Sequence, residues 1–167
     1  MTITEWVSEE GLAKKPLWTP KQAIEQALKE QHTPTAMYYD LCDHFVARMY
    51  GYAYSGYASA ITHWESIPWH GVVPTNPADN LKSNANWRGI LPGALCFFTV
   101  PHTTSGHVCL FYQGNVMISN DVKRPGRIDG VTFEEMREHW GDVKFLGWAK
   151  PDFYASGGTN GLTPPPK

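Results

Sequence analysis

The sequence predicts an α+β fold in which N-terminal helices pack on an antiparallel β-sheet. Apolar residues recur at helical spacing before residue 66, whereas after residue 93 they form short runs separated by turn residues. This order, helices first and then a meander with one late helix, differs from the strand–helix alternation of parallel sheets. The 167 residues, 42% hydrophobic and 18% charged, fit one globular domain with its own core.

The first expected helix covers residues 20–31. Thr19 and Gln22 have the spacing of a capping box, and Pro20 suits the first turn of a helix. A shorter helix is expected over residues 58–65, where apolar side chains again follow helical spacing.

Between these two helices, residues 41–50 predict another helix that carries the first cysteine. Asp40 is the expected N-cap, which would place Cys42 in the first turn, and Thr35 is an alternative start one turn earlier. This position matters because the free N–H groups of a helix start stabilise an anion.

The C-terminal half predicts strands, and Gln113-Gly114-Asn115 reads as a hairpin turn between two of them. Thr132 and Glu135 form a second capping box, which opens a helix to about residue 140. A long ordered loop is expected over the proline-rich residues 68–93. The expected strands cover residues 94–100, 107–112, 116–120 and 143–148.

Residues 1–154 are expected to form the single domain, followed by a linker over residues 155–167. The linker is rich in Gly, Ser, Thr and Pro, and such a composition cannot build a core. A linker at this place suggests a further domain after it. The first 15 residues contain acidic side chains and no apolar stretch, so no signal peptide is expected.

Charge and cysteine content argue against several functions. The formal net charge is −2 without a long run of like charges, so no nucleic-acid partner is expected. No apolar run approaches the ~20 residues of a membrane span, so no membrane insertion is expected. The cysteines and histidines lack zinc-motif spacing, and His70 and His102 join His107 only in an unspecific pattern. We therefore expect neither a metal nor another cofactor.

A nucleophilic cysteine needs a histidine to hold its proton and a third group to orient that histidine. Cys42 at a helix start and His107 at the beginning of a strand fit the first two roles, with His102 as a rival base. Asn120 and Asp121 end the partner strand of the hairpin and are the candidates for the third role. A cysteine alone in an amphipathic helix is more often a small buried hydrophobe, as we expect for the cysteines of the strands.

Three segments, taken together, add a resemblance to a known family. Tyr38-Tyr39-Asp40-Leu41-Cys42-Asp43-His44-Phe45-Val46 resembles the nucleophile helix of papain-like cell-wall hydrolases of the CHAP and NlpC types. Pro92-Gly93-Ala94-Leu95-Cys96-Phe97-Phe98 resembles their next strand, and Gly106-His107-Val108 with Phe111-Tyr112 resembles their catalytic hairpin. The resemblance covers about residues 35–153 and implies a papain-like fold and a cysteine amidase or peptidase.

Other segments resemble the endolysins of phages that infect actinobacteria. They are Ser119-Asn120-Asp121-Val122, Gly126-Arg127-Ile128-Asp129 and Phe145-Leu146-Gly147-Trp148. This resemblance implies bacterial peptidoglycan as the partner. It also implies synthesis in the host cytoplasm, release by a holin, and a wall-binding domain after the linker. A toxin delivered by a secretion machine fits the missing signal peptide as well.

The resemblance implies that Cys42 attacks an amide carbonyl and that His107 protonates the leaving amine. The backbone N–H of Cys42 would stabilise the oxyanion, and Tyr38 or Tyr39 could provide a second donor. The pattern differs from the NlpC type because Leu41 stands directly before the cysteine and no histidine occupies the third position. We favour Asp121 as the third member, with Asn120 as the alternative.

Other functions on the same fold remain open. A non-catalytic wall-binding or phage structural module would need no activated cysteine. An acyltransferase would form the thioester but pass its acyl group to an amine or alcohol. The sequence does not distinguish the muramoyl amide, a stem-peptide bond and a crossbridge as the bond that is cut.

Overall fold

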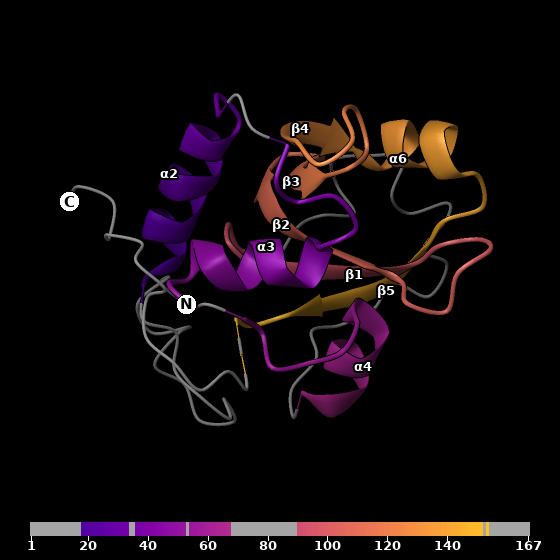
Figure 1. Ribbon diagram of the computed structural model, residues 1–167, viewed down its shortest axis with the longest axis horizontal. Coiled ribbons are helices and arrows are strands. Elements are labelled where there is room, and N and C mark those ends of the chain that lie inside the picture. Colours follow the sequence, from indigo (N-terminus) through magenta and orange to yellow (C-terminus); the bar gives the residue numbers. More distant parts are fainter. Residues whose placement is uncertain (1–17, 34–35, 53, 68–89, 152, 154–167) are drawn as a thin grey trace.

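The computed structural model describes residues 18–33, 36–52, 54–67, 90–151 and 153. A five-stranded antiparallel sheet with the order β4-β3-β2-β1-β5 lies at its centre. Helices lie on both faces of this sheet (Figure 1). The predicted α+β class is confirmed.

Three of the four described helices begin at a residue whose side chain caps them. Both predicted capping boxes are present, Thr19 with Gln22 and Thr132 with Glu135. The expected N-cap Asp40 is wrong: Leu41 caps the cysteine helix without a side-chain hydrogen bond, and Asp40 has a φ of 56°. The helices are α2 (Pro20–Glu30), α3 (Cys42–Met49), α4 (Ala60–Ser66) and α6 (Phe133–Trp140).

Four strands agree with the prediction to within two residues at each end, and a fifth strand was not expected. That strand, β4, contains Asp129 and Gly130, residue types that are depleted in strands. It forms because the Asp129 carboxylate accepts two hydrogen bonds from Arg124, while its backbone pairs with β3. The strands are β1 (Leu95–Thr99), β2 (His107–Gln113), β3 (Val116–Asn120), β4 (Ile128–Thr132) and β5 (Lys144–Ala149).

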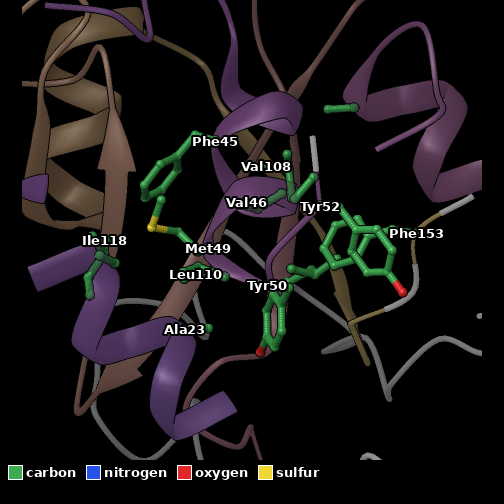
Figure 2. Packing of buried hydrophobic residues seen from close by; sticks show 14 of the residues in the cluster. Ala23, Phe45, Val46, Met49, Tyr50, Tyr52, Val108, Leu110, Ile118 and Phe153 are labelled. Carbon is green, nitrogen blue, oxygen red and sulfur yellow. The ribbon is translucent and has the colours of Figure 1, made fainter. Parts of the chain in front are cut away.

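Alternating side chains of the strands build a separate core on each face of the sheet. Phe97 and Leu110 face the core under α2, α3 and α4, whereas Phe98 and Phe111 face the core under α6. Figure 2 shows the first core, where side chains of α3 contact those of β2. Because both faces are covered, the strands read as nearly continuous apolar runs in the sequence.

The packing of α3 over β2 positions the start of the helix. β2 begins at His107, and its antiparallel neighbour β3 ends at Asn120. The first turn of α3 therefore lies beside the end of the sheet where these polar residues gather, as the contacts below show.

Several expectations fall on other parts of the chain. Most of the predicted loop at 68–93, including His70, and the predicted linker at 155–167 lie outside the described residues. The linker and the further domain therefore stay predictions. Among the described helices, none is long and apolar enough to cross a membrane.

Candidate functional site

Cys42 is the first residue of α3, and the residue is half-buried. The backbone N–H groups of Val108 and Asp43 donate to its sulfur and favour the thiolate. Burial, and next the negative charge of Asp43, outweigh them and raise the pKa of the thiol to about 12. The predicted place at a helix start is confirmed. However, the thiol is protonated at neutral pH, which differs from the low pKa that a helix start favours.

His107 is the first residue of β2, and its side chain is buried. Burial lowers the pKa of the imidazole to about 3, so the ring is neutral at neutral pH. The ring of Trp140 packs edge-on against it, with 4.7 Å between the ring centroids. A neutral imidazole can accept a proton, as a general base must.

Ser119 determines which nitrogen of His107 can accept that proton. Its Oγ lies 2.7 Å from His107 Nε2, and its hydroxyl donates to the carbonyl oxygen of Asn120 at 2.9 Å. Because a hydroxyl carries a single proton, Ser119 Oγ accepts a hydrogen bond from Nε2–H. The other ring nitrogen, Nδ1, then has its lone pair available.

The two expected orienting residues hold the loop before the nucleophile. Asn120 Nδ2 donates to the carbonyl oxygen of Tyr38 at 2.8 Å, and the Oδ1 atom of Asn120 is buried without a partner. Asp121 accepts from the backbone N–H of Asp40 at 2.7 Å and from that of Gly126. In the described part of the chain, the hydrogen bond of the His107 ring goes to Ser119, not to Asn120 or Asp121.

Cys42, His107 and Asp121 line one cavity of about 140 Å³, together with Trp140. A larger cavity of about 450 Å³ is also lined by Cys42, together with residues of α3, the start of α4, the connection between them, and the loops before α3 and β2. The two cavities share four lining residues, so Cys42 lies where they meet. These four are Asp40, Cys42, Ser105 and Gly106.

A second histidine lies close behind the nucleophile. His63 on α4 is fully buried, and its Nδ1 lies 2.6 Å from Asp43 Oδ1. The ring of His63 stacks on Tyr57, with 4.3 Å between centroids and 14° between planes. The packing of α3 and α4 brings Asp43 and His63 together although they lie 20 positions apart in the sequence.

The remaining candidates lie apart from this arrangement. Cys96 and Cys109 are buried in strands, as expected. The Tyr38 hydroxyl accepts from Arg48 Nε at the last turn of α3, so it is engaged away from Cys42. Tyr39 is exposed. No three metal-ligating side chains group together within the described ranges.

Comparison with protein-family models, curated proteins and solved structures finds no match for this chain. The site must therefore be interpreted from its own chemistry. A thiol and a neutral imidazole at one cavity, with the imidazole tautomer held by a hydroxyl, can transfer an acyl group. The same cavity walls could also serve binding alone.

Sequence analysis missed Ser119 and the Asp43–His63 pair. Strand pairing contains a signal for Ser119, because side chains diagonal to each other across a hairpin share one face of the sheet. With Leu110 opposite Ile118, Ser119 lies on the same face as His107. The Asp43–His63 pair has no comparable signal, since it depends on how two helices pack.

Proposed function

We propose that this protein is a peptidoglycan hydrolase that cleaves an amide or peptide bond of the bacterial cell wall through a Cys42 thioester. The observation that carries the proposal is the convergence of Cys42 and His107 on one cavity, with His107 Nε2–H bonded to Ser119. The peptidoglycan substrate and the papain-like fold rest on the resemblance of the sequence motifs to CHAP- and NlpC-type hydrolases.

The resting pair is neutral, so the proton moves during the attack. His107 Nδ1 accepts the proton of the Cys42 thiol as its sulfur bonds to the substrate carbonyl carbon. The carbonyl oxygen becomes an oxyanion, which the backbone N–H of Cys42 in the first turn of α3 stabilises. His107 then donates the proton to the leaving amine, and water hydrolyses the thioester.

Three polar residues support this pair in different ways. Ser119 keeps the His107 tautomer that leaves Nδ1 free to act as a base. Asn120 and Asp121 hold the loop at residues 38–40 and thereby position the start of α3. Asp121 also lines the cavity with His107, where its carboxylate can stabilise an imidazolium across that space.

A non-catalytic wall-binding module is the second candidate function. The observation in its favour is the thiol pKa of about 12, because a binding module needs no activated cysteine. This module would bind peptidoglycan without releasing fragments. Measurement of fragment release therefore separates it from the hydrolase.

The deciding experiment compares Cys42→Ala with the natural protein on purified peptidoglycan. Turbidity and mass analysis of released fragments would report hydrolysis and identify the bond. We expect Cys42→Ala to abolish release while the melting temperature stays near that of the natural protein. Cys96→Ser, normalised to folded protein, should keep its rate because Cys96 is buried in the other core. Full activity of Cys42→Ala would refute the mechanism.

A further inference from the structure

A buried pair of polar side chains beside the nucleophile plays no part in the steps proposed above. Asp43 is 7% exposed and His63 on α4 is fully buried, with 2.6 Å between Asp43 Oδ1 and His63 Nδ1. Burial of such a pair gains little net stability, because the desolvation of both groups opposes their attraction. Its place next to Cys42 therefore calls for a functional reason.

The surroundings of His63 fix the orientation of its ring. Tyr57 stacks on it with 4.3 Å between the centroids and 14° between the planes, and Phe97 of β1 packs edge-on at 5.2 Å. These neighbours leave the buried imidazole little room to turn. Asp43 therefore meets a donor in a defined position, and the pair joins the first turn of α3 to α4.

The side chain of Asp43 depends on His63 for its hydrogen bonding. Its Oδ2 atom is buried without a partner, so within the described residues the carboxylate bonds to His63 through Oδ1. An ionised carboxylate accepts and cannot donate, so the proton in this bond lies on His63 Nδ1. The imidazole N–H points at the carboxylate and offsets part of its negative charge.

Asp43 in turn acts on Cys42, in two opposite directions. Its backbone N–H donates to the Cys42 sulfur, which favours the thiolate. The negative charge of its side chain disfavours the thiolate and is, after burial, the next cause of the raised pKa of the thiol. The reactivity of Cys42 therefore depends on how well the charge of this side chain is offset.

We propose that His63 is a positioning residue for Cys42. It holds the Asp43 carboxylate at α4 and offsets its charge, so that the Cys42 thiol gives up its proton more readily. The transfer of that proton to His107 belongs to the proposed hydrolase function, on which this inference rests. His63 lines neither cavity, so it acts through Asp43 and not by contact with a substrate.

The other ionisable groups near Cys42 do not take this role. Asp121 also disfavours the thiolate, although less than Asp43 does, and backbone N–H groups bind its carboxylate. Burial lowers the pKa of both His107 and His44, so neither adds positive charge at neutral pH. Of the described groups that act on the thiol, Asp43 is the one that an imidazole binds directly.

The test measures the rate of Cys42 alkylation by iodoacetamide at pH 8, followed by peptide mapping, in the full chain and its variants. His63→Phe keeps an aromatic ring beside Tyr57 but removes the donor to Asp43, and it should slow alkylation about threefold. Asp43→Asn removes the charge and should accelerate alkylation about threefold. His63→Asn places an N–H near the position of Nδ1 and should restore the natural rate to within about twofold.

A double variant shows whether His63 acts through Asp43. If it does, His63→Phe no longer slows alkylation once Asp43→Asn has removed the carboxylate, and the double variant matches Asp43→Asn. Asp142→Asn, exposed after α6, is the control for loss of a distant charge and should keep the natural rate. On peptidoglycan, the kcat of His63→Phe should fall with little change in KM, because His63 lines neither cavity.

Opposite effects of His63→Phe and Asp43→Asn on alkylation support the inference. A purely structural pair would loosen the start of α3 in both variants, so rates that change in the same direction, or not at all, overturn it. If His63→Phe does not fold, Asp43→Asn decides alone: a faster rate supports the inference and an unchanged rate overturns it. Opposite effects in a protein that releases no peptidoglycan fragments support the positioning role and contradict the hydrolase.

Discussion

At the scale of single residues, the candidate site depends on a few hydrogen bonds to buried groups. Ser119 receives the Nε2–H of His107, and the backbone of Val108 donates to the sulfur of Cys42. Neither contact makes Cys42 or His107 charged, so in the free protein Cys42 is a thiol and His107 is a neutral imidazole. The reactivity of the site must therefore come from proton transfer during the attack, and two measurements examine this.

Ser119→Ala should lower kcat about 10- to 100-fold with little change in KM, because it removes the group that keeps Nδ1 of His107 unprotonated. Nitrogen NMR of His107 provides a direct readout, since the natural protein should show the Nε2–H tautomer and the variant a mixture. Asp121→Ala should mainly lower the melting temperature. A larger loss of kcat in Asp121→Ala than in Ser119→Ala would instead favour Asp121 as the orienting residue.

The reactivity of Cys42 should report its high pKa. With a pKa of about 12, the rate of alkylation by iodoacetamide should rise steadily between pH 6 and pH 10 in the free protein. Cys96 and Cys109 are fully buried and should react far more slowly, which peptide mapping would verify. A plateau of the Cys42 rate near neutral pH would reveal a preformed thiolate–imidazolium pair instead.

At the scale of elements, the loop before β2 is held by close backbone packing against α4. The backbone N–H of Ile61 donates to the carbonyl oxygen of Ser105 at 3.0 Å. Gly106 follows with a φ of +69°, and a Cβ there would lie 2.6 Å from Ile61 Cγ1 and 2.8 Å from the Phe98 carbonyl oxygen. Only glycine satisfies both the backbone angle and the available space, so the start of β2 is tightly defined.

Gly106→Ala should reduce the free energy of unfolding by about 2 kcal/mol or more, because it adds steric contact to a strained backbone angle. Gly114→Ala is the matched control. Gly114 has a φ of +59°, but nothing lies within 4 Å of its added Cβ, so this change should cost about 1 kcal/mol from backbone strain alone. Urea unfolding of both variants measures the difference. Equal losses would show that the contact with α4 is unimportant.

At the scale of the whole molecule, the sheet separates two cores, and polar residues gather where strands end. Burial of His107 in this setting makes stability depend on pH. Its pKa is about 3 in the folded protein and near 6.5 in an unfolded chain, so the unfolded state binds the proton more readily. The contribution of His107 to stability is complete above about pH 6.5 and is lost progressively as the pH falls toward 3.

The natural protein should therefore lose about 2 kcal/mol more than His107→Gln when the pH is lowered from 7 to 5. Urea unfolding at the two pH values measures this difference, and the glutamine variant serves as the control because it cannot titrate. The same loss in both proteins would mean that His107 is accessible to protons in the folded state.

Local signals in the sequence were sufficient for the elements and for part of the site. Capping residues such as Thr19 and Thr132 act on the nearest turn of the chain, and apolar periodicity reflects which face of an element is buried. The α+β class, four strands and the place of Cys42 at the start of a helix could therefore be predicted. The reactive roles of Cys42 and His107 remain predictions for experiment.

Only the tertiary structure determined which polar groups meet. Three contacts illustrate this. His107 lies 12 positions from its partner Ser119, Asp43 lies 20 positions from His63, and Asp40 lies 81 positions from Asp121, which accepts its backbone N–H. The high pKa of Cys42 likewise depends on burial by the surrounding fold, which opposes the effect of the helix start. The register of the β2–β3 hairpin places Ser119 on the same face as His107. The other contacts and the desolvation of Cys42 depend on how helices and strands pack, and no local pattern in the sequence records them.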